Sequence, residues 1–263
     1  KTLFFYLFIF SSLIVYVYIL SKDLPSLDEL QKFNPQQVSK IVSADGVVIN
    51  KLYTHKRDMV NISVIPVNLR NALFAMEDRD FYQHSGISIK ATVRAIIVDV
   101  VTLSTRQGAS TITQQLARNM YNSIGFKKTI NRKIKELITA IKIEQTYTKS
   151  EILELYLNSI YFGHGNYGVQ SASIYYFSKN VSKLTLDEAS ILIGLLPAPA
   201  RYSPIRHPEK SLNRRNLVLN VMYNEGYISN EELQENLSKE LSVSKSEYNN
   251  SIAPHFTEYI RRE

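Results

Sequence analysis

The sequence lacks cysteine altogether, and its 263 residues include only nine glycines and eight prolines. Without cysteine, the chain can form neither a disulfide framework nor a thiolate metal site. Its five histidines, at positions 55, 84, 164, 207 and 255, show no paired spacing typical of metal ligands. Acidic residues are also in deficit, because 31 Lys and Arg face 24 Asp and Glu and leave a net charge of +7. This excess indicates an anionic partner: a nucleic acid, an anionic membrane or a phosphorylated substrate.

Charge is absent from one long stretch, Thr2–Leu20, which is apolar apart from a few hydroxyl-bearing residues. The stretch approaches the roughly 20 residues that a helix needs to span a bilayer. A cleaved signal peptide would have a shorter apolar region, of about 7–15 residues, and small residues at the cut. Because the polar sequence SKDLPS follows instead, we predict an uncleaved transmembrane anchor over residues 1–21.

Residues 22–60 form a connector in which a β-hairpin is predicted. Asp45-Gly46 is a strong turn signal, and Ser39–Ala44 and Val47–Tyr53 flank it as strands. A second apolar stretch, Ile87–Leu103, carries only three charged residues. Two interpretations explain it about equally well: a core helix, or a surface that dips into the membrane beside the anchor.

The stretch with the most chemistry is Ala75–Gly86, which reads AMEDRDFYQHSG. The apolar spacing predicts a helix that is capped at Asn68 and ends near Ser85-Gly86. Glu77 lies among apolar residues there, and partial desolvation would raise the pKa of its carboxyl and suit it to proton transfer. Taken alone, however, the stretch is explained better by acidic and basic side chains that pair on a solvated helix end.

The segment Gln107–Asn119, QGASTITQQLARN, is rich in small and hydroxyl-bearing residues. It predicts a helix that begins at Thr111, with Ser110 or Thr111 as the N-cap. The free backbone amides at such a helix start suit sugar hydroxyls or phosphate oxygens. Many loops share this composition, so the segment by itself is weak evidence for a ligand.

A basic amphipathic helix is predicted over Phe126–Gln145. At about 100° per residue, an apolar face forms from Ile130, Ile134, Leu137, Ile138 and Ile141. The opposite face carries Lys128, Arg132, Lys135 and Glu136. Eight basic and two acidic residues fall between Arg118 and Lys149, so this part of the chain holds +6 of the net charge of +7. An ordinary surface helix mixes charge signs for pairing one turn apart, so the excess favours an anion-binding role.

The two glutamates are predicted to behave differently. Glu136 has Arg132 one turn before it and Lys135 beside it. Its carboxylate is therefore expected to stay ionised and to orient the basic residues, whereas Glu77 is the candidate proton acceptor. Downstream, further helices are predicted around Ile152–Leu157, over Leu186–Leu196 and from Arg214-Arg215 onward.

Five segments follow one another along the chain in this order: EDRDFYQHSG, GASTITQQLARN, RKIKE, ILELYLNSIYFGHGNYG, and LPAPARYSP followed by Arg214-Arg215. Together they resemble the five motifs of the family 51 peptidoglycan glycosyltransferases, the lipid II polymerases found alone or at the front of class A penicillin-binding proteins. The resemblance covers roughly Ser39 to Met222. It implies a mainly α fold: a bilobal, lysozyme-like glycosyltransferase domain with a small membrane-dipping lobe, preceded by one transmembrane helix and a short β-hairpin.

The resemblance also assigns roles to residues. Glu77 matches the family's catalytic carboxylate, the general base on the 4-hydroxyl of the acceptor N-acetylglucosamine, and Glu136 matches its second glutamate. Arg118 stands where the family usually has a lysine that contacts the diphosphate; the charge is kept, but Arg is a planar donor. Basic positions near the donor diphosphate are matched by Lys128, Arg132, Lys133 and Lys135. The same motifs supply the remaining predicted substrate-binding residues: Asp78, Arg79, His84, Ser110, Thr111, Gln114 and Gln115.

The resemblance implies an organisation and a set of partners. The expected parts are the anchor (1–21), the connector (22–60), the glycosyltransferase domain (61–240) and a linker (241–263) towards a transpeptidase domain. The expected partners are lipid II, the growing glycan strand, the lipid bilayer and cell-wall synthesis proteins, with no nucleic acid. The catalytic domain is expected on the outer face of the cytoplasmic membrane. A divalent cation, Mg²⁺ or Mn²⁺, is compatible with the family's diphosphate chemistry, but no residue pattern here encodes a metal site.

Two other functions fit parts of the sequence. A lysozyme-like hydrolase or lytic enzyme would share the fold and a single glutamate, but it would not need the basic residues between Arg118 and Lys135. A membrane-anchored module that binds nucleic acid or anionic lipid would use the charge, but it would leave EDRDFYQHSG unexplained.

Overall fold

The computed structural model describes residues 2–31, 39–43, 48–52, 56–90, 92–93, 110–121, 124–125 and 129–243. The predicted Asp45-Gly46 turn, Lys128 and the end of the chain from residue 244 lie outside the described residues. The described chain is mostly helical, which confirms the mainly α prediction. It divides into two compact units, one of Lys1–Asn34 and Asp80–Leu153, and one of Pro35–Arg79 and Glu154–Glu263. The bilobal arrangement stays a prediction.

The first unit is built from helices α1 (Thr2–Ser21), α2 (Leu27–Gln31), α5 (Ile112–Met120) and α6 (Ile130–Thr146). Helix α6 is its centre, because α1, α2 and α5 all contact it. The hydroxyl of Tyr16 on α1 donates to Asn131 Oδ1 at the start of α6. Near the other end of α6, Lys142 Nζ donates to the carbonyl oxygen of Pro25 at 2.9 Å.

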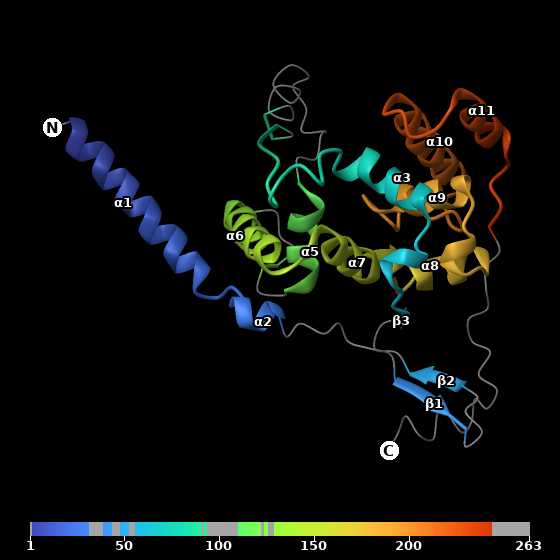
Figure 1. Ribbon diagram of the computed structural model, residues 1–263, viewed down its shortest axis with the longest axis horizontal. Helices are drawn as coiled ribbons and strands as arrows, with labels where there is room; N and C mark the ends of the chain where they lie inside the picture. The colour runs from blue at the N-terminus through green and yellow to red at the C-terminus, as the bar shows by residue number, and fades with distance from the viewer. Residues whose placement is uncertain are drawn as a thin grey trace. The chain divides into compact units, whose positions relative to one another are not determined.

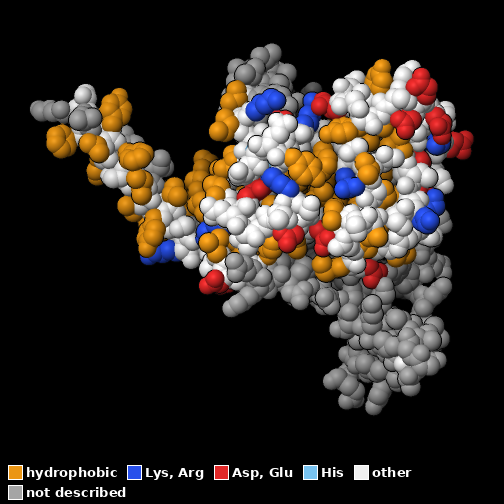
Figure 2. All heavy atoms as spheres, in the orientation of Figure 1, with side chains coloured by type: hydrophobic (Ala, Val, Ile, Leu, Met, Phe, Trp, Pro, Cys, Tyr) orange, Lys and Arg blue, Asp and Glu red, His pale blue; other side chains and the backbone are white. Residues whose placement is uncertain are grey.

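Helix α1 is long and apolar enough over Phe4–Ser21 to cross a membrane, although a signal sequence near an N-terminus would pass the same test. Its large side chains are exposed along its length, as the orange side chains of Figure 2 show; Phe4, for example, is 79% exposed. Of the predicted membrane-dipping stretch Ile87–Leu103, residues 91 and 94–103 lie outside the described part. In the part that is described, Ile89 and Val93 are 76% and 49% exposed and do not belong to the core.

The second unit holds the strands, two short 3₁₀ helices and the remaining helices. Its strands are β1 (Ser39–Val42), β2 (Val48–Leu52), β3 (Lys56–Arg57), β4 (Tyr161–Gly163) and β5 (Asn166–Tyr167). Its helices are η1 (Ile62–Val64), α3 (Val67–Glu77), α8 (Val169–Phe177), η2 (Val181–Lys183), α9 (Leu186–Leu195), α10 (Pro208–Asn224) and α11 (Asn230–Ser238). Helix α7 (Lys149–Ser159) belongs to the first unit up to Leu153 and to the second from Glu154.

The strands form two small sheets. β1 and β2 pair antiparallel, with Ser39 opposite Leu52, which confirms the predicted hairpin strands. The other sheet has the order β3-β5-β4, with a parallel β3–β5 pair and an antiparallel β4–β5 pair. Asn158 fastens the segment after β3 to α7, because its side chain accepts from the Val60 amide and donates to the Val60 carbonyl.

The core of the second unit is centred on α9, all ten residues of which are buried. Helices α3 and α10 pack on α9 and on each other (Figure 1). Arg215 of α10 is completely buried, and its guanidinium donates to the carbonyl oxygens of Lys239 at 2.7 Å and Leu237 at 3.3 Å. It thereby satisfies carbonyls at the end of α11 that would otherwise be unpaired.

Two of the predicted helices have wrong boundaries. Helix α3 begins at Val67 after Pro66 rather than at an Asn68 cap, and it ends at Glu77 rather than near Gly86. Asp78 adopts φ −160°, which leaves the helix, and the Gly86 carbonyl accepts side-chain hydrogen bonds instead of continuing a helix. Helix α10 begins at Pro208, a residue favoured in the first turn, so Arg214-Arg215 lie well inside it.

Candidate functional site

An ordinary surface helix buries its apolar face and exposes its charged face, and α6 (Ile130–Thr146) does the opposite. Its buried residues are Glu136, Thr139, Ala140 and Ile143. The apolar face predicted from the sequence is more accessible, with Ile130 79% exposed and Ile141 41% exposed. The charged side of the helix therefore faces the interior of the first unit, where α5 packs against it.

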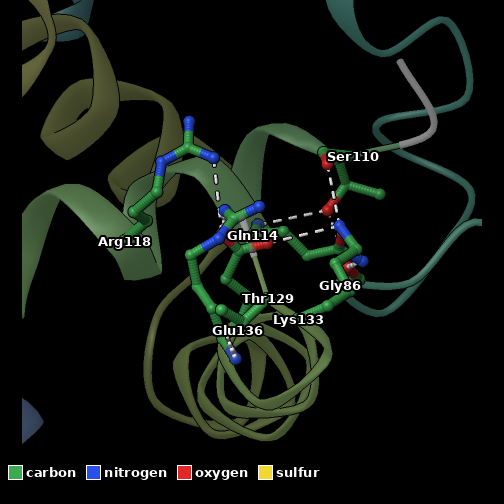
Figure 3. Close-up of polar contacts among 9 residues, drawn as sticks. Gly86, Ser110, Gln114, Arg118, Thr129, Lys133 and Glu136 are labelled. Atoms are coloured by element: carbon green, nitrogen blue, oxygen red, sulfur yellow. Dashed lines mark hydrogen bonds and ion pairs between the residues drawn. The ribbon is translucent and has the colours of Figure 1, made fainter. Parts of the chain in front are cut away.

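Glu136 is the centre of a cluster of three cations, shown in Figure 3. Its carboxylate accepts from Arg118 at 3.3 Å, from Lys133 at 3.3 Å and from Arg132 one turn before it. The Glu136 side chain is 1% exposed, whereas Arg118, Arg132 and Lys133 are 26%, 15% and 37% exposed. We call these four residues the cation cluster. Its formal charge is +2, so it can attract an anion although its carboxylate is fully paired.

Lys133 connects the cation cluster to α5 and to the residue before its N-cap. Besides Glu136, its ammonium donates to Ser110 Oγ at 2.7 Å and to Gln114 Oε1 at 2.6 Å. Three acceptors match the three donors of an ammonium. Burial lowers the pKa of Lys133 below its ordinary value, and the charges of Arg132 and Arg118 lower it further, while Glu136 opposes this shift.

The loop after Arg79 is anchored to α5 and α6. The Gly86 carbonyl accepts from Thr111 Oγ1 at 2.7 Å and from Gln114 Nε2 at 3.3 Å. Thr111 is the N-cap of α5, as predicted, and its hydroxyl also accepts from the Gln114 amide. Gly86 has φ +87°, and a Cβ there would lie 3.0 Å from the Ala140 carbonyl oxygen, so only glycine fits.

A second set of contacts holds the same loop, and sequence reasoning missed it. Lys149 Nζ donates to the His84 carbonyl at 2.6 Å and to Glu144 Oε1 at 2.8 Å, and it lies 4.6 Å from the centre of the Phe81 ring. Glu144 also accepts from Thr113 at 2.6 Å. Glu144 follows Glu136 by eight residues, two steps of i+4, so this spacing could have placed it on the buried face of α6.

Glu77 belongs to the other unit and has different surroundings. It is the last residue of α3, it is half-buried, and it follows the buried residues Leu73, Phe74 and Ala75. The backbone amide of Asp78 caps the helix by donating to the Phe74 carbonyl. A helix C-terminus carries partial negative charge, and Glu77 lies at that end of α3.

The other predicted site residues are placed as follows. Arg79 pairs with Glu225 at the end of α10. Lys135 lies 3.6 Å from Asp23, so it faces the segment between α1 and α2 and is not among the ion-pair partners of Glu136 in the described chain. His84 Nδ1 accepts from the Gly86 amide at 3.1 Å. Asp78 is buried and Gln115 is half-buried.

The cluster is suited to an anion and not to a divalent cation. Its one carboxylate already accepts from three cations, and like charge would repel a metal ion. Within the described ranges, no group of three or more His, Cys, Asp or Glu side chains is arranged to hold a metal ion. The residues of the cluster therefore do not fit the Mg²⁺ or Mn²⁺ that the resemblance suggested.

Comparison with known proteins identifies the family of this chain. The family described as Transglycosylase matches residues 45–223. The chain is 46% identical over 237 residues to penicillin-binding protein 1A of Aquifex aeolicus, covering 90% of this chain and 32% of that protein. It is 42% identical over 251 residues to penicillin-binding protein 1F of Bacillus subtilis, covering 95% of this chain and 34% of that protein. The chain thus spans about a third of the length of the curated relatives it matches.

A crystal structure of penicillin-binding protein 1A from Haemophilus influenzae aligns with a TM-score of 0.49 at 27% identity, covering 88% of this chain and 24% of that one. The family match extends over more than half of the chain and includes Glu77 and the whole cation cluster. The chain belongs to the transglycosylase family, the family 51 peptidoglycan glycosyltransferases that its five motifs resemble.

Proposed function

We propose that this chain polymerises lipid II into β-1,4-linked glycan strands and releases polyprenyl diphosphate. The observation that carries the proposal is the cation cluster, in which a buried carboxylate holds three cations in place and leaves a charge of +2. Such a site suits a diphosphate, which carries several negative charges and many acceptor oxygens. Arg118 is partly exposed, at 26%, and its planar guanidinium can bind two phosphate oxygens at once, which makes it the first candidate for direct contact.

The leaving group explains why one base is sufficient. In the proposed reaction, the acceptor 4-oxygen forms a bond to the donor's anomeric carbon while the bond from that carbon to the diphosphate oxygen breaks. The departing diphosphate needs its developing charge neutralised rather than protonated, which cations do. Glycosidases that cleave a sugar–sugar bond need a second carboxyl to protonate the leaving oxygen.

We assign the base to Glu77. It takes the proton of the acceptor 4-hydroxyl as the new bond forms, a role suited to a carboxyl placed at a helix C-terminus next to buried apolar residues. Glu136 is assigned a different role, because protonating it would discharge the partner of three cations. It holds the cluster in position, and Ser110 and Gln115 near the start of α5 border the substrate. Thr111 is buried, and its hydroxyl is used by Gly86 and Gln114, so we assign it a structural role.

We also propose that α1 anchors the chain in the cytoplasmic membrane, with the catalytic part on the outer face, where lipid II is displayed. The proposed parts are the anchor (1–21), the connector (22–60), the glycosyltransferase domain (61–240) and the linker (241–263). Exposed Ile89, Val93 and Ile130 in the first unit would add lipid contact. Accessibility of the domain to protease in intact spheroplasts is the expected result, and protection would contradict this orientation.

The experiment is incubation of the purified chain with labelled lipid II in detergent, followed by gel analysis. A ladder of glycan products is expected, and it should disappear in Glu77→Gln. If the purified chain is correctly folded and does not polymerise lipid II, the proposal is overturned. Release of fragments from pre-formed glycan would favour a lytic enzyme instead, and salt-sensitive binding without turnover would favour a binding module.

A further inference from the structure

Two adjacent glutamines on α5 have different environments. Gln114 is 2% exposed, whereas Gln115 is half-buried. Both polar atoms of the Gln114 amide are used within the protein, by Lys133 at 2.6 Å and by the Gly86 carbonyl at 3.3 Å (Figure 3). A substrate could contact Gln114 only by displacing one of these partners, so a role in binding sugar or phosphate does not suit this residue.

The orientation of the Gln114 amide is dictated by its partners. An ammonium only donates and a carbonyl oxygen only accepts. The amide oxygen must therefore face Lys133, and the amide NH₂ must face Gly86. A flipped amide would place donor against donor and acceptor against acceptor, so the side chain has one stable arrangement.

The Gly86 end of this contact is rigid. The Gly86 carbonyl is also held by Thr111, and the φ of +87° and the close Ala140 carbonyl fix the backbone there. The Lys133 end is a long side chain, and such a side chain loses considerable rotamer entropy when it is fixed. Gln114 therefore holds the flexible Lys133 ammonium at a fixed distance from the rigid Gly86 carbonyl.

We propose that Gln114 is a positioning residue that holds Lys133 in the cation cluster by linking its ammonium to the Gly86 carbonyl. This inference rests on the proposed function, in which the cluster neutralises the leaving diphosphate. Gln114 would not contact the substrate. It would connect the loop that follows the Glu77 motif to the cations of α6, so that both keep their place within the first unit during turnover.

The pKa of Lys133 depends on its hydrogen bond to the Gln114 amide oxygen, so the charge state of Lys133 can be used to detect that hydrogen bond. The charged groups that face its ammonium are Glu136 and Arg132 on α6 and Arg118 on α5, and Ser110 is the other neutral acceptor. A hydrogen bond to the ammonium favours its charged form. Removing the Gln114 acceptor should lower the pKa of Lys133, and replacing it with a carboxylate should raise that pKa.

The test uses the full chain with Gln114→Met, Gln114→Glu and, as a matched control, Gln145→Met at an exposed position of α6. The pH dependence of acylation of Lys133 is measured by mass spectrometry of its peptide, which requires no substrate. Gln114→Met should make Lys133 more reactive at a fixed pH, roughly tenfold for a shift of one pKa unit. Gln114→Glu should make it less reactive, and Gln145→Met should leave it unchanged.

A purely structural role for Gln114 would not produce shifts of opposite sign. If both Gln114 variants change the reactivity of Lys133 in the same direction, or neither does, the proposal is overturned. Should Gln114→Met fail to fold, Gln114→Glu decides alone at the Lys133 end of the link, because it keeps the oxygen that accepts from Lys133 and loses only the donor to Gly86. Unchanged or increased Lys133 reactivity in this variant overturns the proposal. Polymerisation of lipid II by the unmodified chain tests the proposed function separately.

Discussion

Glu77 and Glu136 belong to different units and have opposite surroundings. Glu136 is completely buried and accepts from Arg118, Arg132 and Lys133. Glu77 is half-buried at the end of α3, where the helix C-terminus repels negative charge. Three cations therefore surround one carboxyl group, whereas the other stands at a helix end beside buried apolar residues. The same side chain therefore stands in two different electrostatic environments, which its neighbours create.

The two units also differ in their surfaces. The unit that contains Glu136 carries α1 and exposes Ile89 and Ile130, at 76% and 79%. In the described part of the unit that contains Glu77, the most exposed large apolar side chain is Val67, at 57%. This difference predicts that lipid and diphosphate are bound mainly through residues of the first unit, and that proton transfer depends on a residue of the second.

The largest expected effect is that of Glu77→Gln. The substitution keeps the shape of the side chain and removes the base, so the polymerisation rate should fall by about 10²–10⁴-fold. Thermal stability and affinity for a soluble polyprenyl diphosphate should change little, because Glu77 is not in the cation cluster. The measurement is the rate of glycan formation from lipid II, with Glu209→Gln at an exposed position of α10 as the matched control. A rate close to that of the unmodified enzyme would remove Glu77 from the mechanism.

The next largest effect is expected for Glu136→Gln, and it should fall mainly on stability and binding. Removing one partner of a buried ion pair costs about 3 kcal/mol at the lower end of the usual range. We expect the lower end, because Arg118 and Lys133 are 26% and 37% exposed and water screens their charges. Chemical denaturation should show the loss, and calorimetry should show weaker diphosphate binding. An unchanged denaturation midpoint would mean that Glu136 does not organise the cluster.

A smaller effect is expected at the membrane-facing side of the first unit. In a chain that begins at Lys22, Ile89→Asn together with Ile130→Asn should weaken binding to anionic liposomes by about tenfold or more, since two isoleucines that are each about half buried in lipid contribute about 1.5–3 kcal/mol together. Leu217→Asn in the second unit, 44% exposed, is the matched control and should have little effect. Equal liposome binding by all three chains would show that the exposed isoleucines do not contact lipid.

The smallest effect is expected for Glu225→Gln, which removes the ion-pair partner of Arg79 next to the Glu77 motif. The pair is exposed at the surface, and such pairs contribute at most about 1 kcal/mol. The unfolding free energy and the polymerisation rate should therefore change only slightly. A loss as large as that of Glu77→Gln would show that the pair positions the base, and it would extend the catalytic site to the end of α10.

Much of the fold could be predicted from local signals. The Thr111 cap, the β1–β2 strands and the helical class follow from side-chain hydrogen bonding, β-branched composition and apolar spacing. The burial of the charged face of α6 could not be predicted in this way, because periodicity shows that a helix has two faces but not which one is buried. Glu136 is buried because three cations compensate for its desolvation, and those cations come partly from another helix.

The candidate site was predictable in its motifs but not in its contacts. Sequence spacing put Lys135 beside Glu136, whereas the structure pairs Glu136 with Arg118 and Lys133 and turns Lys135 towards Asp23. Lys149 and Glu144, which anchor the loop before Gly86, belong to no motif that the sequence singled out. Contacts between segments far apart in the chain depend on tertiary packing, and local propensity does not encode them.

The roles of the two glutamates are tested most directly by comparing Glu77→Gln and Glu136→Gln in the same two assays: the rate of glycan formation at saturating lipid II, and the affinity for a soluble polyprenyl diphosphate. Glu77→Gln should lose rate and keep affinity, whereas Glu136→Gln should lose affinity together with rate. If Glu77→Gln keeps its rate while Glu136→Gln is inactive with unchanged affinity, the assignment of the base to Glu77 and of the organising carboxylate to Glu136 is contradicted.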